Sequence, residues 1–302
     1  MFGQEARFPV FVTGTQRSGT TLMHHILDCS SQFWSRNEMY PVHQLVFGRS
    51  KPSQIEQLRQ QLNGFLKLDL PETTCGDNEA ERVKLLATAL DAAASKAGKP
   101  RWCLKDPAAT YYLQEYATAF PDAKFVIMIR DPRAVCRSYL SPIGFTVGRP
   151  ANWIAAAERW TNEVEGQISF ANEHPDRVML MHYESAVSQL GVELRRLCSF
   201  CEIPNEPALH LYYKHESQAR IHNGNRNILT PPDPAKADKW KSTMSKRQMQ
   251  TVESIAMEML AKLRYDAMQP FTRTSRMRLA TARVHDRLVR EWRWQMHKLR
   301  KQ

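Results

Sequence analysis

Residues 8–23 read FPVFVTGTQRSGTTLM. A short β-branched and aromatic run ends at Gly14, a polar loop follows, and helix-forming residues resume after Gly19. That order predicts a strand, a loop and a helix. Backbone N–H groups at such a helix N-terminus, together with the helix dipole, attract an anion. The stretch therefore predicts a phosphate-binding loop in an α/β fold.

The spacing Gly14-x4-Gly19 matches a P-loop, except that Thr20 stands where a lysine is expected. Arg17, inside the loop, is the cation that would take the place of that lysine. In ATPases and GTPases the lysine spans the outer phosphates and the next hydroxyl holds magnesium, so its loss argues against an ordinary member of those classes. The simpler alternative is a βα turn without a ligand. The residues expected to contact the anion are Arg17, Ser18, Gly19, Thr20 and Thr21.

Composition indicates one folded domain and a basic tail. The chain has 302 residues, of which 42% are hydrophobic, which is enough for a large buried core. Residues 270–302 hold ten Lys and Arg but two Asp and Glu, a net charge of +8 out of the total of +11. We therefore expect a near-neutral domain over 1–269 and a separate basic segment over 270–302.

The cysteines and the hydropathy of the chain predict its setting. Six cysteines show no disulfide framework, and the CxxC formed by Cys198 and Cys201 has no second pair to complete a zinc site. Buried free thiols in a reducing compartment are the expectation. No apolar segment precedes the first predicted strand, and no run is long enough to span a bilayer, so we expect no signal peptide, no transmembrane segment and a cytoplasmic location.

Strand-like and helical segments alternate along the chain. The predicted strands are residues 8–13, 33–38, 101–107, 124–130 and 177–182. This alternation predicts an α/β fold with a five-stranded parallel sheet flanked by helices, whose functional groups gather at the carboxyl ends of the strands. Residues 40–98 form a mostly helical insertion, with helices expected over 53–66 and 78–97. We expect that insertion to lie over the carboxyl end of the sheet as a substrate lid.

Two of these strand ends carry a family resemblance. Residues 16–21 follow a strand, and Arg130-Asp131-Pro132-Arg133 follows another, with Ser138 eight residues after Arg130. These segments resemble the two signatures of P-loop sulfotransferases, the 5′-phosphosulfate loop and the 3′-phosphate site. Leu104-Lys105-Asp106-Pro107, Glu38 and residues 259–266 resemble more narrowly the tyrosylprotein sulfotransferase branch and its bacterial relatives. The resemblance spans about residues 8–268.

The resemblance implies a donor, an acceptor and roles for single residues. The donor is 3′-phosphoadenosine 5′-phosphosulfate (PAPS), whose two anionic ends need two sites, and the acceptor is a hydroxyl of a peptide tyrosine, a sugar or a small metabolite. In-line transfer relies on positioning, on cations at the leaving phosphate and on a base, with no metal. Arg17 and Lys105 match the cations and Glu38 matches the base. The remaining donor contacts implied are Arg130, Ser138, Tyr183, Arg220, Asn225 and Lys239.

Simpler interpretations of four of these residues stay open. Glu38 also fits a solvated loop carboxylate, and Lys105 a surface lysine paired with Asp106. Arg133 fits a salt-bridge partner as well as a donor contact. Tyr183 fits a core aromatic residue as well as a neighbour of the adenine.

The chain also departs from the family pattern. The second arginine of the 3′-phosphate site falls near Pro142 here, so that contact is missing or is supplied by Arg137 or Arg149. No serine aligns in the loop before Lys239. Secretory-pathway relatives pair a cysteine at the position of Cys103 with one just before the glutamate, where this chain has residues 36–37, Arg and Asn.

Two other functions compete with sulfuryl transfer. One is an ATP- and magnesium-dependent P-loop phosphotransferase, which the missing lysine and the Arg130–Ser138 site argue against. The other is a nucleotide-binding interaction protein with a retired site, which the presence of Glu38, Arg17 and Lys105 argues against.

The basic tail has helical periodicity. Its apolar residues recur at helical spacing among arginines and lysines, which predicts a basic amphipathic helix over 276–300. The apolar positions are Val284, Leu288, Trp292, Met296 and Leu299. Docking on the body or on a partner subunit is the first expectation and contact with an anionic membrane surface the second. Nucleic acid is not an expected partner, since no recognition fold accompanies the charge.

Overall fold

The computed structural model describes residues 8–48, 54–72, 76–141, 148–215, 226–270 and 272–299. All five predicted strands form within them: β1 Val10–Thr13, β2 Phe33–Arg36, β3 Arg101–Lys105, β4 Lys124–Ile129 and β5 Val178–His182. Every pairing is parallel and the strand order is β2-β3-β1-β4-β5. The predicted fold class is confirmed. β1 lies where the strand order reverses, and ligands of open parallel sheets bind at such a point, outside the carboxyl ends of the strands.

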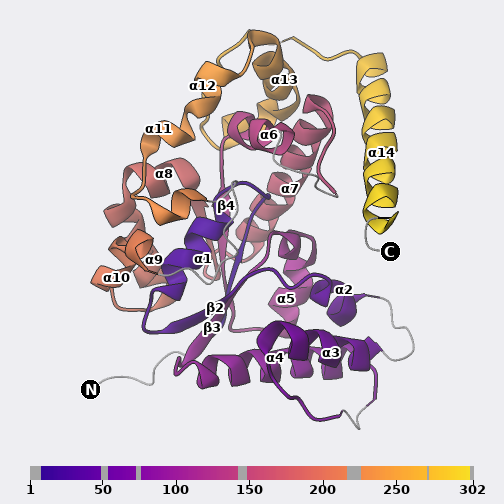
Figure 1. The fold of residues 1–302 in the computed structure, drawn as a ribbon. Coiled ribbons are helices and arrows are strands. Elements are labelled where there is room, and N and C mark those ends of the chain that lie inside the picture. The colour runs from indigo at the N-terminus through magenta and orange to yellow at the C-terminus, as the bar shows by residue number, and fades with distance from the viewer. Residues whose placement is uncertain are drawn as a thin grey trace.

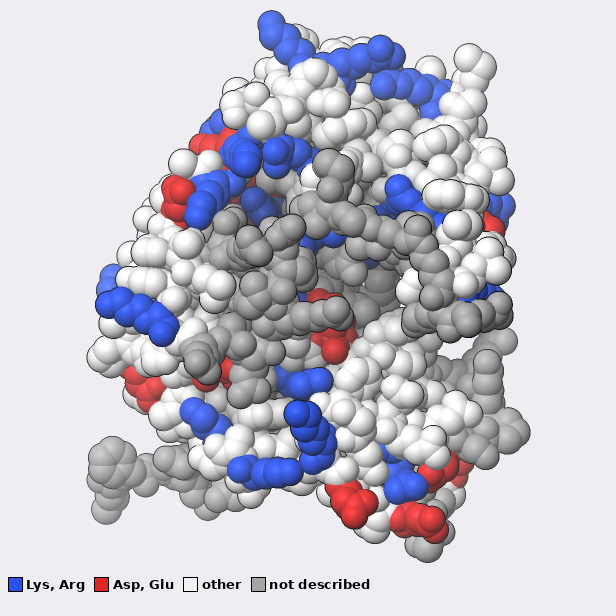
Figure 2. All heavy atoms as spheres, in the orientation of Figure 1, with Lys and Arg blue, Asp and Glu red and all other residues white. Residues whose placement is uncertain are grey.

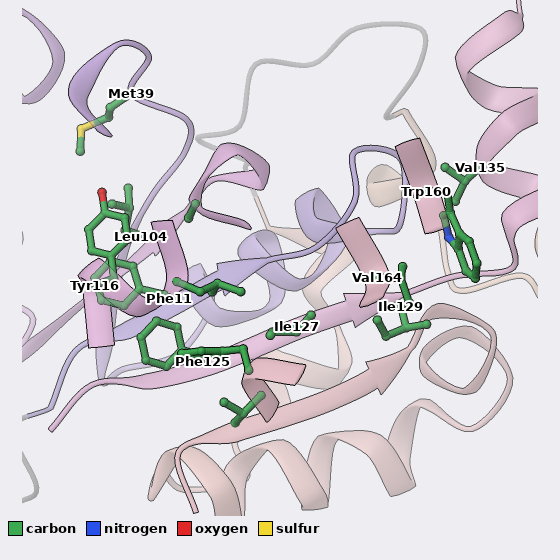
Figure 3. Close-up of a cluster of buried hydrophobic side chains, with 14 of the residues drawn as sticks. Phe11, Met39, Leu104, Tyr116, Phe125, Ile127, Ile129, Val135, Trp160 and Val164 are labelled. Atoms are coloured by element: carbon green, nitrogen blue, oxygen red, sulfur yellow. The ribbon is translucent and has the colours of Figure 1, made fainter. Parts of the chain in front are cut away.

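The central strands bury both of their faces. Phe11, Phe125 and Ile127 point to one side, into the core shown in Figure 3, while Val10 and Val126 point to the other. Successive residues of a strand alternate in this way, and a continuous apolar run therefore indicates a strand covered on both sides. Each of these five side chains is fully buried.

Helices form a layer on each side of the sheet (Figure 1). The layer around Phe11 contains α2 Val42–Phe47, α3 Gln54–Leu66, α4 Glu79–Lys96, the 3₁₀ turn η1 Pro107–Tyr112, α5 Leu113–Ala119, α6 Pro132–Leu140, α7 Trp153–Glu173, α12 Lys239–Thr243 and α13 Lys246–Lys262. The layer around Val10 contains α1 Thr20–Asp28, α8 Tyr183–Ser188, α9 Leu190–Cys201, α10 Pro207–His210, η2 Tyr212–Lys214, η3 Arg226–Leu229 and α11 Pro234–Ala237.

The insertion over 40–98 lies differently from the prediction. Its helices α3 and α4 pack on a face of the sheet, because Leu62 and Leu90 are fully buried in the same core as Phe11. Asp91 on α4 accepts a hydrogen bond from Trp102 Nε1 at 2.8 Å, which fixes α4 along β3. The start of the insertion, through α2, lies at the carboxyl end of β3, where His43 Nε2 lies 2.8 Å from Asp106 Oδ2. A lid role for this segment stays a prediction.

The predicted tail helix forms as α14, Arg276–Leu299, at the edge of the molecule beside α7 (Figure 1). Its expected docking on the body is therefore observed, but through a face other than the predicted apolar one, since Val284 and Leu288 are 58% and 64% exposed. The domain boundary at residue 269 stays a prediction. Among the described residues, no helix combines the length and the apolar character that crossing a bilayer needs.

The described cysteines are free thiols, as expected, namely Cys29, Cys103, Cys136, Cys198 and Cys201. Cys198 and Cys201 both lie on α9 and are buried. Cys75 lies outside the described residues.

His24, on α1, gives the fold a testable dependence on pH. Burial, helped by the charge of Lys105, lowers the pKa of His24 to about 3, and its Nδ1 lies 2.5 Å from Ser35 Oγ. The unfolded chain protonates this imidazole near pH 6.5 while the folded protein does not. The stabilisation is therefore present above that pH and is lost as the pH falls toward 3. We expect an extra loss of about 1.4 kcal/mol in the free energy of unfolding per pH unit below about pH 6.

Urea titrations at several pH values, on the wild type and on His24→Gln, measure this effect. The variant is expected to lose the extra slope, whereas His285→Gln, at an exposed position of α14, is expected to keep it. Equal slopes in the wild type and His24→Gln would contradict the assignment to His24.

Candidate active site

The loop after β1 requires glycine at both ends. Gly14 has a φ of 141°, and a Cβ there would lie 2.4 Å from the carbonyl oxygen of Met128 on β4. Gly19 has a φ of 98°, and its Cβ would lie 2.5 Å from Cδ2 of Tyr183. Because glycine alone fits such conformations without strain, the two glycines allow the loop to lie against β4 and α8. The loop therefore connects β1 directly to the N-terminus of α1, which is the order that the sequence predicts.

Arg17 joins the two predicted anion sites. Its backbone has a φ of 76°, a left-handed conformation that non-glycine residues adopt mainly where function or context demands it. Its Nε donates a hydrogen bond to Ser138 Oγ at 2.8 Å, and its carbonyl oxygen accepts one from Arg130 Nη1 at 3.0 Å. The 5′ and 3′ sites predicted from two separate motifs are therefore one continuous cluster.

The cluster is strongly cationic. Burial lowers the pKa of Arg17, and the charges of Arg149 and Arg130 lower it further, whereas the charge of Glu38 acts in the opposite direction. Like charges held together in a partly buried place are stabilised by an anion between them. Figure 2 shows a hollow near the middle of this face, with acidic atoms at its floor and basic side chains above and below it.

A pocket opens beside this cluster and the start of α1. Tyr183, on α8, forms one wall, and the guanidinium of Arg130 stacks on its ring with 4.1 Å from Cζ to the ring centroid. Tyr183 is 8% exposed and packs in the core layer around Val10, so its ring belongs to the core and to the pocket wall at once. The lining residues are Arg17, Gly19, Thr20, Thr21, Leu22, Arg130, Tyr183, Val187, Tyr212, Ile228, Pro231, Pro232, Asp233 and Lys236.

Buried polar atoms in and beside the loop have no partner among the described residues. They include Thr15 Oγ1, Ser18 Oγ and Arg130 Nε. A buried polar group without a hydrogen bond costs about 1–3 kcal/mol, so such groups usually await a water or a ligand. Arg130 lines the pocket, so an acceptor bound there would give Arg130 Nε a partner, whereas Ser18 does not line it.

Lys105 and Glu38, the other two residues predicted to take part in catalysis, lie against each other, and neither lines this pocket. Lys105 Nζ lies 2.5 Å from Glu38 Oε1 and donates a hydrogen bond to Asn37 Oδ1 at 3.0 Å. Lys105 is 1% exposed, so it is not the surface lysine of the simpler interpretation. It does not pair with Asp106 either, whose carboxylate lies against His43. The side chain of Glu38 is 48% exposed, which leaves its other oxygen accessible to a substrate.

Comparison with known proteins shows the family of the chain. The sequence matches the model of the sulfotransferase family over residues 9–207. The chain belongs to the sulfotransferase family. It is 27% identical over 276 residues to Protein-tyrosine sulfotransferase 1 of Danio rerio, which covers 85% of this chain and 72% of the relative. It is 26% identical over 273 residues to the Protein-tyrosine sulfotransferase of Drosophila melanogaster, with 85% of this chain but 51% of that protein covered.

Solved structures share the fold of this sulfotransferase. The sulfotransferase domain from the curacin biosynthetic pathway has a TM-score of 0.61 at 20% identity and covers 88% of this chain and 100% of that one. The sulfotransferase domain from the olefin synthase of Synechococcus PCC 7002 has a TM-score of 0.57 at 20% identity, with coverages of 84% and 96%. These likenesses confirm the predicted fold.

Two interpretations of Arg133 were open, a salt-bridge partner and a donor contact. In the structure of this sulfotransferase it is a salt-bridge partner. It is 3% exposed and forms salt bridges with Asp131 at 2.7 Å and Glu253 at 2.6 Å. Its guanidinium also lies over the Trp240 ring, 4.1 Å from the centroid. Arg133 does not line the pocket. It fixes the start of α6, the helix that carries Ser138.

The structure places some of the residues that could replace the missing family contacts. Of the two candidates for the missing second arginine, Arg149 lies close enough for its charge to lower the pKa of Arg17. Lys239 is exposed at the start of α12 and does not line the pocket, whereas Lys236 on α11 does. Arg220 and Asn225, like Pro142, lie outside the described residues.

The sequence analysis missed one wall of the pocket. Pro231, Pro232, Asp233 and Lys236 form it, after the segment in which no serine could be aligned. The signal was present, because Pro-Pro-Asp-Pro over 231–234 stiffens the backbone and Asp233 caps α11. Rigid backbone next to a predicted nucleotide site is a reasonable mark of a pocket wall.

Proposed function

We propose that this sulfotransferase transfers a sulfuryl group from PAPS to an acceptor hydroxyl. The observation that carries the proposal is the continuity of two anion sites through one side chain, since Arg17 bonds Ser138 at 2.8 Å and its own backbone bonds Arg130 at 3.0 Å. The family membership already supports a sulfotransferase. A donor with a 5′-phosphosulfate and a 3′-phosphate fits such a double site, with Tyr183 beside the nucleoside.

The residues can be assigned to the steps of an in-line transfer. The loop N–H groups, Arg17 and Lys105 stabilise the negative charge that develops on the leaving 5′-phosphate. Glu38 accepts the proton of the acceptor hydroxyl as the acceptor oxygen bonds to sulfur. The sulfur–oxygen bond to the phosphate breaks, and 3′-phosphoadenosine 5′-phosphate leaves with the electron pair. Thr20 and Thr21 add hydroxyl donors at the start of α1.

The names of the relatives support one acceptor class as the first to test. Both relatives described above carry names that assign them to protein tyrosine. A tyrosine in a peptide is therefore the first acceptor to test, before a sugar or a small metabolite. Since Glu38 follows β2 and is half exposed, a bulky hydroxyl can approach it from solvent.

Calorimetric titration with 3′-phosphoadenosine 5′-phosphate tests the donor. We expect the wild type to bind this bisphosphate in the presence of a chelator, and Arg130→Ala to bind it at least about 30-fold more weakly, because a buried charge partner is lost. Arg196→Ala is the matched control, since the side chain of Arg196 is 54% exposed on α9. ATP with magnesium is titrated in parallel.

The other outcomes decide against the proposal. Binding of ATP with magnesium but not of the bisphosphate would favour a phosphotransferase. Binding of the bisphosphate without turnover on any tyrosine, sugar or metabolite acceptor would favour a retired nucleotide-binding protein. Among the described residues no group of His, Cys, Asp and Glu is placed to hold a metal, and the chelator arm tests the metal independence itself.

The cellular setting is part of the proposal. We propose a reducing compartment, such as the cytoplasm, on the ground that the five described cysteines are free thiols. Burial raises the pKa of Cys29 and Cys201 to about 12, which keeps these two protonated and unreactive. Titration of thiols in the denatured protein, isolated without reductant, checks this point.

A further inference from the structure

The helix α14 is held to the body by a defined face. The carboxylate of Asp286 accepts a hydrogen bond from the backbone of Ala151 at 2.7 Å, and Asn152 donates one to the carbonyl oxygen of Ala282 at 2.9 Å. Arg283 forms a salt bridge with Glu158 at 2.7 Å. These contacts fix the rotation of α14 about its own axis. The opposite face must therefore point away from the body.

That opposite face carries several large apolar side chains. Met277, Val284, Leu288 and Leu299 follow one another at helical spacing and are 78%, 58%, 64% and 64% exposed. Large apolar side chains are common singly on a surface, but a row of four along one helix face marks an interaction site. The helix thus presents its apolar stripe outward although it docks on the protein.

A row of cations runs along one side of the stripe. Arg276, Arg287 and Lys298 are spaced by eleven residues, which is close to three helical turns, so they lie in line. All three are exposed and form no ion pair with a described residue. Glu291 is the one acid of α14 near them. Arg283, another arginine of α14, instead holds the helix to the body through its salt bridge with Glu158.

We propose that the outward face of α14 binds an anionic lipid surface. Apolar side chains enter the boundary between headgroups and acyl chains while a flanking row of cations contacts acidic headgroups. A second copy of the chain fits this face less well, because antiparallel pairing of two such helices would bring their cationic rows to the same side, and no acidic row faces the cations in a parallel pair. The charge of the face therefore selects the lipid as the occupant.

Vesicle co-sedimentation of the full chain tests the proposal without any sulfotransferase assay. We expect binding to phosphatidylcholine vesicles that contain phosphatidylserine and much weaker binding to phosphatidylcholine alone. The double variant Leu288→Ser with Leu299→Ser is expected to lower the partition coefficient at least about tenfold, since two apolar side chains no longer enter the bilayer. Arg287→Gln is expected to lower it about fivefold.

Matched variants elsewhere on the surface show whether vesicle binding needs this face of α14 or any exposed apolar or cationic side chain. Met257→Ser, at a 45% exposed position of α13, and Arg195→Gln, at an exposed position of α9, are expected to bind like the wild type. The substituted side chains of α14 are exposed, so thermal unfolding should be unchanged. Absence of binding to anionic vesicles would overturn the proposal, as would a dimer in sedimentation velocity that Leu288→Ser abolishes.

Discussion

Replacing Glu38 by glutamine is expected to lower kcat by a factor of about 10² to 10⁴. The amide keeps the size of the side chain and can still accept a hydrogen bond from Lys105, but it cannot take the proton of the acceptor hydroxyl. Affinity for 3′-phosphoadenosine 5′-phosphate should stay close to that of the wild type, because Arg17, Ser138 and Arg130 lie on the donor side of the site. Single-turnover kinetics with a peptide tyrosine acceptor, next to bisphosphate titration, measure the two quantities.

The competing explanation is that Glu38 only positions Lys105. Asn37→Ala is the control, because it removes the other hydrogen bond of Lys105, at 3.0 Å, and keeps the carboxylate. A base at position 38 predicts a large loss of kcat in Glu38→Gln and a much smaller one in Asn37→Ala. Equal losses of kcat in the two variants would assign Glu38 to positioning.

The sheet and the anion loop were predictable because their signals are local. The unbroken apolar run of β4 admits only a strand covered on both faces, and Gly14 and Gly19 are needed for the conformation of their own backbone. The Arg130–Ser138 pair was also readable, since Arg130 directly follows β4 and Ser138 lies on α6, the helix that comes next. Their link through Arg17 was not, because a hydrogen bond across 121 residues of sequence leaves no periodic trace.

The placement of the insertion and the docking face of the tail helix depended on tertiary packing. Leu62 and Leu90 have the same spacing in a lid helix as in a core helix, so periodicity could not tell that α3 and α4 cover the sheet. For α14, the apolar stripe suggested the docking face. The helix instead docks through Asp286 and Arg283, whose partners lie more than a hundred residues away. Which face of such a helix docks depends on the polar groups of the surface that it contacts, and the sequence of the helix does not show them.

Replacing Arg133 by methionine is expected to lower the free energy of unfolding by about 3–5 kcal/mol. Methionine fills much of the volume but leaves the carboxylates of Asp131 and Glu253, both nearly buried, without their cation. It also removes the hydrogen bond that Arg133 donates to the carbonyl oxygen of Asp266 at 2.9 Å, and the stacking on Trp240. Urea unfolding followed by circular dichroism measures the loss.

The matched control is Arg196→Met, which breaks a salt bridge of equal length, 2.7 Å to Glu193, at a position where the arginine is 54% exposed. Exposed pairs contribute about 0–1 kcal/mol, so this variant should unfold close to the wild type. Adding Glu253→Gln to Arg133→Met should recover part of the stability, because the second change removes one of the two uncompensated charges. If Arg133→Met cost no more than Arg196→Met, the buried ion cluster would not be what holds the start of α6, and the position of Ser138 would need another cause.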